Sequence, residues 1–309
     1  MAPVVEVIGK PLILGEGPFW DSSSQSLYFV DIVDGSIHRY DVASKKHTSA
    51  KLGSEPASLI IEVEGQKDKF VVSQTNDLYV VSWDGVSDKV SSKELLVKLE
   101  ESKEGTRIND GKVDPAGRLW AGSMGPTIEG KDHEWVPEKG SLYRLNRDKT
   151  SSKQLANITL SNGLAWSSDN KKFYYIDTLK YRVDSYDYDN ETGNISNEKT
   201  IFDLKENNIH GFPDGMTIDV EDKLWIAVFG SAKILRVDPT NGKLLTTISF
   251  PSLQITSACF GGPNYDELYV TSANIALTDE QLAKYPHAGS CFRVTNIGVK
   301  GFPSLPVKL

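Results

Sequence analysis

Six copies of one β-type unit follow one another along the chain. The units are marked by short apolar runs that begin near Leu27, Phe70, Leu119, Phe173, Leu224 and Leu268, at spacings of 43, 49, 54, 51 and 44 residues. These runs are rich in β-branched and aromatic residues and are bounded by Gly, Asp, Asn and Pro, as strands are. A second run, which alternates apolar and polar residues, follows each of them, as at 36–41 and 233–238. Repeats of this length, each with room for about four strands, predict an all-β, six-bladed β-propeller.

We expect residues 1–309 to form one propeller domain, with the apolar runs as its innermost strands. The segment 4–9, VVEVIG, is predicted to complete the last blade and close the ring, which removes the exposed edges of an open sheet. A pair of β-sandwiches is the alternative. A sandwich has no physical reason to repeat a motif at this period, so the propeller is favoured.

Four oxygen-bearing side chains occupy one position of the repeat, about ten residues before an apolar run. They are Glu16, Asn109, Asn162 and Asp214, and the two remaining units carry Ser58 and Ser257 at this position. Equivalent positions in a closed ring point at its axis. The sequence therefore predicts two carboxylates and two amides around one mouth of a central channel.

A divalent metal site is the functional interpretation of this cluster. Glu16, Asn162 and Asp214 offer the hard oxygen ligands that suit Ca²⁺, Mg²⁺ or Mn²⁺, and Zn²⁺ is also compatible with carboxylates. Three protein ligands leave positions open for water and substrate, as a hydrolytic metal centre requires. In the alternative interpretation, these side chains only hydrogen-bond the turns between strands.

Residues beside the cluster extend this prediction. Glycine follows Asn162 and Asp214 and also occurs within 109–114, and we expect it to let the backbone turn sharply there. Arg107 lies two residues before Asn109 on an extended segment, so both side chains face one side. Arg107 is placed to bind or polarise a substrate oxygen, or else to form a salt bridge with Glu16 or Asp110.

One stretch, GPTIEGKDHEWVPEKG at 125–140, interrupts the third unit. Its prolines and glycines predict an ordered loop over one face of the propeller. Such a loop serves either as a lid over the channel mouth or as a plain surface connection.

Composition excludes several classes of partner. The formal net charge of −8 argues against nucleic acid, and no apolar stretch approaches the roughly 20 residues that span a bilayer. The N-terminal segment lacks the pattern of a secretory signal, and two cysteines, Cys259 and Cys291, are too few for a disulfide framework. We therefore expect a cytoplasmic monomer, with a peroxisomal location suggested only by the final Val-Lys-Leu.

Four motifs, in order along the chain, resemble one known family. They are LGEGPFWD at 14–21, RINDGKVDPAGRLWAGSM at 107–124, SNGLAWSSDNKKFYYID at 161–177 and PDGMTIDVEDKLWIA at 213–227. They resemble the senescence-marker-protein/gluconolactonase/regucalcin family, and within it the luciferin-regenerating branch. The resemblance implies a six-bladed propeller with one divalent metal, Ca²⁺ first, held by Glu16, Asn162 and Asp214. It further implies that Asp214 is the general base and that Arg107 and Asn109 contact the substrate, with Asp110 beside them orienting Arg107.

The segment after GSM departs from the sugar-lactone-hydrolysing relatives, which the resemblance credits with a carboxylate that contacts sugar hydroxyls. Here Gly125, Pro126 and Thr127 stand in that region, and the next carboxylate is Glu129. Loss of that acceptor weakens polyol recognition. Phe19, Trp20, Trp135 and Phe212, expected near the mouth, suit a flat aromatic ligand instead.

We therefore predict a metal-dependent, hydrolase-type enzyme acting on a cyclic small molecule, most of all oxyluciferin, with a cyano-benzothiazole as the implied product. A gluconolactonase-like sugar-lactone hydrolase and a non-catalytic calcium-binding regulator of regucalcin type are the alternatives.

Overall fold

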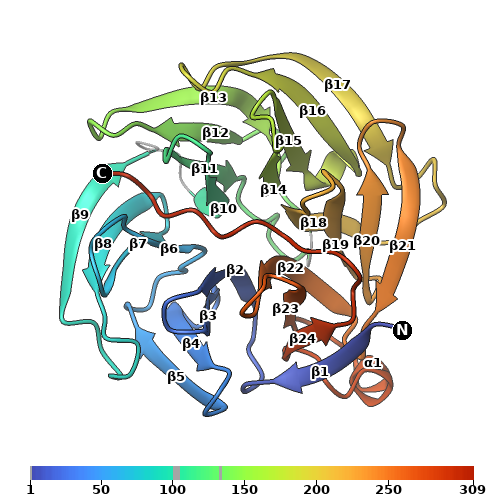
Figure 1. The fold of residues 1–309 in the computed structure, drawn as a ribbon, viewed down its shortest axis with the longest axis horizontal. Helices are drawn as coiled ribbons and strands as arrows, with labels where there is room; N and C mark the ends of the chain where they lie inside the picture. Colours follow the sequence, from blue (N-terminus) through green and yellow to red (C-terminus); the bar gives the residue numbers. More distant parts are fainter. Residues whose placement is uncertain (1, 100–104, 132–133) are drawn as a thin grey trace.

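The computed structural model describes residues 2–99, 105–131 and 134–309 (Figure 1). Within these residues, four-stranded antiparallel sheets form six blades around a central axis, so the predicted six-bladed propeller is confirmed. In the first five blades the strands are hydrogen-bonded in chain order, from the innermost to the outermost. Short turns between neighbouring strands make this arrangement possible.

The first three blades lie between residues 15 and 158. The first blade consists of β2 (Gly15–Asp21), β3 (Ser26–Asp31), β4 (Ser36–Asp41) and β5 (Lys46–Lys51). The second consists of β6 (Ile60–Glu62), β7 (Lys69–Gln74), β8 (Asp77–Ser82) and β9 (Ser92–Lys98). The third consists of β10 (Arg107–Val113), β11 (Leu119–Met124), β12 (Gly140–Leu145) and β13 (Ser151–Ile158).

The remaining three blades complete the ring. The fourth consists of β14 (Ser161–Trp166), β15 (Lys172–Asp177), β16 (Arg182–Tyr188) and β17 (Ile195–Asp203), with the 3-10 helix η1 (Thr178–Lys180) after β15. The fifth consists of β18 (Phe212–Ile218), β19 (Leu224–Phe229), β20 (Lys233–Asp238) and β21 (Lys243–Ser249). The sixth combines β22 (Gln254–Gly261), β23 (Glu267–Ala273) and β24 (Cys291–Thr295) with the N-terminal β1 (Val4–Ile8).

The two ends of the chain close the ring in the sixth blade. Strand β1 pairs antiparallel with β24, from Val4 opposite Thr295 to Ile8 opposite Cys291. This confirms the predicted role of the segment 4–9. The outer edge of the last blade thus comes from the opposite end of the chain, which ties the blades together without an open seam (Figure 1).

The apolar runs were expected to be the innermost strands, and this prediction is wrong by one strand. They form the second strands β3, β7, β11, β15, β19 and β23. A second strand is covered on both faces by neighbouring blades and flanked on both edges by its own sheet. Every residue of β3 and β11 is buried, whereas β2 contains three half-buried residues and β10 contains four. The strongest apolar signal therefore marks the second strand, and the candidate site residues lie on the innermost strand itself.

Five of the six innermost strands, all except β6, share a register irregularity near the position of the candidate site. Pairing with the second strand shifts between Glu16 and Phe19 in β2 and between Asn162 and Leu164 in β14. Comparable shifts occur in β10, β18 and β22. A bulge inserts an extra residue and changes which side chains face the axis. In β10 it lies between Ile108 and Asp110, so Asn109 and the following residues serve different parts of the channel.

Six hydrophobic clusters fill the spaces between neighbouring blades. Between the third and fourth blades, for example, Trp120 packs against Trp166 and Phe173, with ring centroids 5.8 and 5.0 Å apart. Each cluster draws residues from both of the blades that it joins. The blades are therefore held to one another by buried apolar area, and the polar channel lies along the axis inside this ring.

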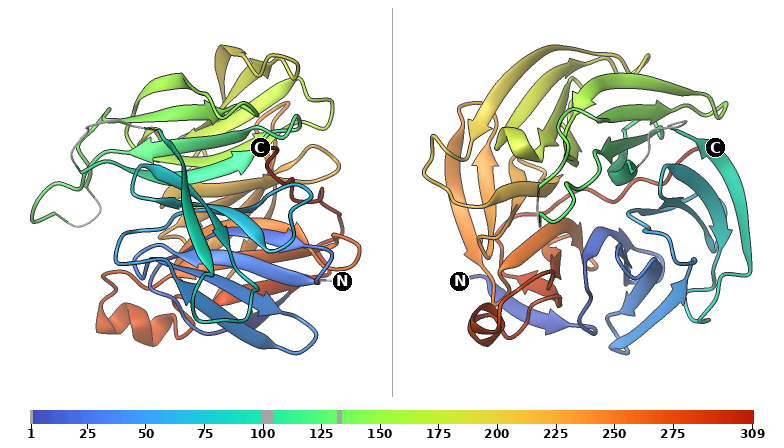
Figure 2. Two further views of the ribbon diagram at one scale, coloured as in Figure 1. Left: turned by 90° about the vertical axis from the view of Figure 1, so that its left-hand side faces the viewer. Right: turned by 180° about the vertical axis from the view of Figure 1, so that it is seen from behind.

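The two faces of the propeller carry different coverings. Figure 2 shows the insert within 125–140 and the short helix α1 (Asp279–Lys284) on one face, and the C-terminal segment on the other. We call residues 300–309 the C-terminal strap. No helix in the described residues is long and apolar enough to cross a membrane.

Candidate functional site

A pocket at the insert-covered face brings together five of the predicted site residues. We call it the mouth pocket; its volume is about 100 Å³. Its polar side chains come from four innermost strands and are Glu16, Arg107, Asn109, Asn162 and Asp214. The remaining lining is apolar or aromatic, apart from Thr178 after β15, and includes Leu14, Ile32, Met124, Trp135, Leu160, Phe212, Phe229 and Ile275.

A chain of hydrogen bonds orders the amides of this pocket. Arg107 Nη1 donates to Asn109 Oδ1 at 2.8 Å, and Asn109 Nδ2 donates to Asn162 Oδ1 at 3.1 Å. Asn162 Nδ2 donates to Thr178 Oγ1 at 2.8 Å, and Thr178 Oγ1 donates to the Pro213 carbonyl at 2.9 Å. The chain fixes both amides with their oxygens as acceptors, and Asn162 Oδ1 keeps a second lone pair for another partner.

The two carboxylates of the pocket are buried and hold their protons strongly. Burial, reinforced by the negative charge of Asp110, raises the pKa of Glu16 to about 8. Burial, and then the charges of Glu16 and Asp110, raise the pKa of Asp214 well above its usual value. The Gly17 N–H donates to Glu16 Oε2 at 2.8 Å and opposes the shift only in part. Ionising both carboxyl groups would therefore place more negative charge in the pocket than its surroundings neutralise.

Arg107 is the cation of the mouth pocket, but it is turned toward the amides. Burial lowers its pKa to about 10, so the guanidinium stays charged near neutral pH. Its Nη1 donates to Asn109 and to the Ile108 carbonyl, the latter at 3.0 Å. Among the described residues, neither Glu16 nor Asp214 forms an ion pair.

The donor set fits a hard divalent cation. Two buried carboxylates and the Asn162 amide oxygen are ligands that Ca²⁺ and Mg²⁺ accept in proteins. Within the described part of the chain, no three His, Cys, Asp or Glu side chains are grouped as metal ligands. The donors of the mouth pocket do not form such a group, because only two of them are carboxylates and the third oxygen comes from the Asn162 amide.

Three predicted residues lie elsewhere. Asp110 and Ser257 line a second cavity on the strap-covered side of the channel. Ser58 is buried, where its Oγ donates to the Ile108 carbonyl at 2.8 Å and pairs with Ser73 Oγ. The six equivalent positions therefore do not all reach one mouth. Asp110 is not one of these positions but follows Asn109, and the bulge between Ile108 and Asp110 turns it toward the other end of the channel.

The aromatic prediction is half right. Trp135 and Phe212 line the mouth pocket, but Phe19 lines the second cavity and Trp20 stacks on Tyr269 in the core between the sixth and first blades. Phe229 was missed. It ends the apolar run of β19, and the residue that ends a second strand reaches the same face as the start of the innermost strand.

The glycines after Asn162 and Asp214 serve close packing rather than a sharp turn, so that prediction is wrong. Only Gly17, after Glu16, has a positive φ of +54°. A Cβ at Gly163 would lie 2.6 Å from Ile176 Cδ1 and 2.8 Å from the Asp214 carbonyl oxygen. Innermost strands converge at the axis, and a side chain there would push neighbouring blades apart.

The insert contributes one side chain to the mouth pocket. Thr127 and Trp135 form an isolated antiparallel bridge, and the Val136 N–H donates to the Pro126 carbonyl at 2.8 Å. These bonds hold the two arms of the loop together and place Trp135 in the pocket lining. Residues 132 and 133 of the insert lie outside the described part of the chain.

Both cysteines are free and buried in the sixth blade. Burial raises the pKa of Cys259 to about 12, so its thiol is neutral near physiological pH.

Comparison with known proteins gives consistent results. The family model described as the SMP-30/gluconolactonase/LRE-like region matches residues 14–274. Regucalcin from Gallus gallus is 39% identical over 303 residues, covering 98% of this chain and 97% of the relative. The structure of a luciferin-regenerating enzyme superposes with a TM-score of 0.94, at 44% identity and with complete coverage of both chains. A regucalcin from Agrobacterium tumefaciens, described as a calcium-binding protein, superposes with a TM-score of 0.87 at 27% identity, covering 99% of this chain and 97% of that one.

Proposed function

The chain belongs to the SMP-30/gluconolactonase/LRE-like family, and we propose that it is a hydrolase-type enzyme acting on a cyclic small molecule in the mouth pocket. One observation carries the proposal. Glu16 and Asp214, two buried carboxylates without an ion pair, share a pocket with Asn162, Arg107 and an apolar lining. Perturbed carboxylates in a concave apolar site are characteristic of catalytic centres.

Glu16, Asn162 and Asp214 would hold the divalent cation that this donor set fits, with Ca²⁺ first. When bound, such a cation supplies Lewis acidity and lowers the pKa of water. It also relieves the repulsion between the two carboxylates, because both would then be ionised opposite a double positive charge.

The chain's own residues supply the proton transfer and the substrate contacts. Asp214 is the general base: its carboxylate lies in the mouth pocket beside Glu16, where it would accept the proton that an attacking water must lose. Arg107 stabilises negative charge on the substrate oxygen through the guanidinium N–H groups that do not bond to Asn109, and Asn109 positions this guanidinium by accepting from its Nη1. Asp110 acts at a distance, through the charge by which it raises the pKa of Glu16.

The lining favours a flat, apolar ring over a polyol. Trp135, Phe212 and Phe229 surround the polar end of the pocket, and Glu129, the next carboxylate after the GSM segment, does not line it. A site built to select hydroxyls needs polar partners for them. Together with the 44% identity to a luciferin-regenerating enzyme, this supports oxyluciferin as the first substrate to test.

Two other functions remain within the family. The gluconolactonases in its name make sugar lactones the second substrate class. The similarity to regucalcins, one of them described as calcium-binding, supports a non-catalytic calcium regulator. A calcium sensor needs a site whose residues move when the ion binds. The amides of this buried site are already fixed by hydrogen bonds, which favours the enzyme over the regulator.

The test is turnover by protein stripped with a chelator and resupplied with Ca²⁺, Mg²⁺, Mn²⁺ or Zn²⁺. The substrates are oxyluciferin and a panel of γ- and δ-lactones. Metal-restored turnover of oxyluciferin supports the proposal in full. Metal-restored turnover of lactones alone would keep the enzyme but make a lactone its substrate instead of oxyluciferin. Tight Ca²⁺ binding with no turnover under any metal would overturn the enzyme in favour of the regulator.

A further inference from the structure

The C-terminal strap covers a second cavity at the opposite end of the channel. Its ends are fixed: the Gly301 N–H donates to the Tyr265 carbonyl at 2.8 Å, and the Val307 N–H to the Glu62 carbonyl at 2.8 Å. Between them, residues 302–306 form no strand, and Phe302 and Leu305 are 39% and 45% exposed. The strap is therefore held at both ends of the cavity, and between them the Trp20 backbone N–H donates to Ser304 Oγ at 3.3 Å (Figure 1).

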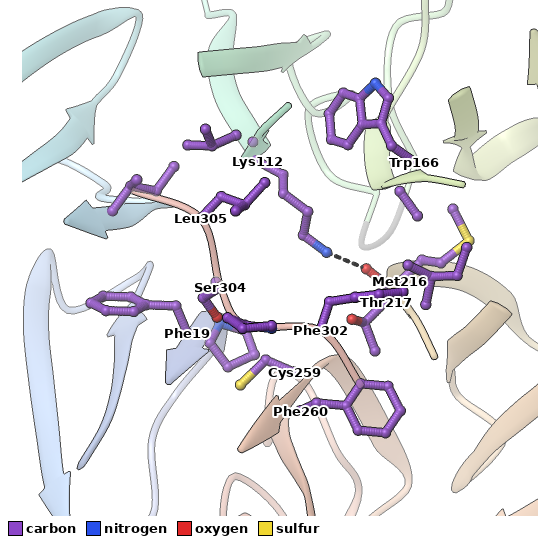
Figure 3. A pocket seen from close by; sticks show the side chains of 18 of the residues that line it. Phe19, Lys112, Trp166, Met216, Thr217, Cys259, Phe260, Phe302, Ser304 and Leu305 are labelled. Atoms are coloured by element: carbon purple, nitrogen blue, oxygen red, sulfur yellow. Dashed lines mark hydrogen bonds between the residues drawn. The ribbon is translucent and has the colours of Figure 1, made fainter. Parts of the chain in front are cut away.

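We call this space the strap cavity; its volume is about 330 Å³. That size lies at the lower end of the roughly 300–1,000 Å³ typical of small-molecule sites. Figure 3 shows side chains from several blades and from the strap around it. Its aromatic lining consists of Phe19, Trp166, Phe260 and Phe302. Most of the lining is apolar, so an occupant gains chiefly from burying an apolar group.

Two opposite charges on one strand face this cavity. Asp110 and Lys112 lie two residues apart on β10, and Gly111 between them packs against β11. Alternate residues of a strand share one face, which places both charges at the channel end of the cavity. Within the described part of the chain, no ion pair joins Asp110 to Lys112, although each group feels the charge of the other. Neither group therefore satisfies the hydrogen-bonding capacity of the other.

Each of these charges has unused bonding capacity. Lys112 Nζ donates to the Met216 carbonyl at 2.6 Å across the channel (Figure 3), which uses one of the three N–H groups of an ammonium. Asp110 Oδ1 accepts the Gly111 N–H at 2.7 Å. No other hydrogen bond of either side chain occurs among the described residues. A sequestered charge with unfilled bonding positions costs free energy unless a ligand satisfies it.

The charge balance of the lining decides between ligand classes. Glu62 borders the cavity as well, so its charged groups are two carboxylates and one ammonium. A plain carboxylic acid would pair with Lys112 but meet net repulsion from Asp110 and Glu62. A plain amine would leave Lys112 unsatisfied. A molecule that carries both groups on one carbon complements Lys112 and Asp110 together.

We propose that the strap cavity is a second small-molecule site, which binds a zwitterionic α-amino acid with an apolar or aromatic side chain. The ligand carboxylate accepts from Lys112 Nζ, its ammonium donates to Asp110, and its side chain lies among the aromatic residues beneath the strap. This site goes beyond the proposed function and does not depend on it.

Isothermal titration calorimetry with phenylalanine tests the site. Phenylalanine should bind at least about ten times more tightly than 3-phenylpropanoate, which lacks the ammonium, and than phenethylamine, which lacks the carboxylate; tenfold corresponds to about 1.4 kcal/mol. Lys112→Met should weaken binding at least tenfold, while Lys171→Met, a change of the same kind at an exposed lysine, should not. Equal binding of 3-phenylpropanoate and phenylalanine would overturn the zwitterion assignment.

Two further variants guard against failures of folding or of the proposed function. Phe302→Ala changes a partly exposed strap residue, and it should weaken phenylalanine binding several-fold without lowering the free energy of unfolding. Asp214→Asn should bind phenylalanine normally whether or not the protein turns over oxyluciferin. Absence of phenylalanine binding to the wild-type protein, or full binding by Lys112→Met, would overturn the site.

Discussion

The mouth pocket and the strap cavity are built from the same strand but in opposite ways. Arg107 and Asn109 of β10 serve the mouth pocket, and after the bulge Asp110 and Lys112 serve the strap cavity. The mouth pocket is small, about 100 Å³, and its amides are bonded into a chain. The strap cavity is larger, about 330 Å³, and its Lys112 has spare donors. One bulge therefore assigns the residues of a single strand to a small pocket with an ordered polar cluster and to a larger cavity with unfilled donors.

The largest expected effect is that of Asp214→Asn, which should affect the mouth pocket and leave the strap cavity unchanged. Asp214→Asn should lower metal-supported turnover at least about 100-fold, because an amide cannot accept the proton of the attacking water. Phenylalanine binding in the strap cavity should change less than twofold. Steady-state kinetics and calorimetry on the same preparation provide the comparison, with the exposed Asp88→Asn as the matched control. Normal turnover by Asp214→Asn would remove Asp214 from the mechanism.

A second variant tests the cation of the mouth pocket. Arg107→Met should reduce kcat/KM roughly 100-fold, since it removes the guanidinium that we propose stabilises the substrate oxygen and frees Asn109 Oδ1. Arg147→Met, at an exposed arginine, should leave kcat/KM unchanged. If Arg107→Met altered only the unfolding free energy, the residue would be structural, and the two ends of the channel would differ less than we propose.

Gly163 lies where the two sites meet, so its substitution should damage both. A Cβ there would approach the Asp214 carbonyl oxygen at 2.8 Å and Met216 Cβ at 2.9 Å, and Met216 borders the strap cavity. We expect Gly163→Ala to lower the free energy of unfolding by about 1–3 kcal/mol in urea titrations. Gly65→Ala, with open space around it but a φ of +67°, measures the backbone cost alone. Equal losses of unfolding free energy in Gly163→Ala and Gly65→Ala would show that the neighbouring blades accommodate the added Cβ without steric strain.

The pH dependence of metal-free protein probes the same boundary. The pKa of Glu16, about 8 in the folded protein, exceeds the usual 4.5, so the folded state binds more protons between these values. Stability therefore falls as pH rises through this window. We expect a loss of at least about 1.4 kcal/mol between pH 5.5 and 8.5, equivalent to one unit of pKa. Glu16→Gln should flatten the dependence, and saturating Ca²⁺ should abolish it; a slope unchanged by both would contradict the electrostatic account of the mouth pocket.

The fold was readable from the chain because a propeller repeats its pattern. Each second strand is buried on both faces, so Leu27 and Leu224 begin runs that stand out at regular spacing. The same burial explains why the apolar runs were predicted to be the innermost strands although they are the second ones. The innermost strands carry more polar residues and therefore give a weaker apolar signal. The candidate site was predictable because Glu16, Asn162 and Asp214 occupy the same position in their repeats, and equivalent positions of a closed ring lie around its axis.

The sequence by itself determined the number of blades, their closure by the N-terminal strand and the residue types that converge on the axis. These follow from local periodicity, which each repeat expresses independently. Only the tertiary structure decided which end of the channel each side chain serves, because the bulges that divide Asn109 from Asp110 depend on pairing with the next strand. The strap cavity likewise exists only once residues 300–309, remote in sequence from β10, are seated across the ring.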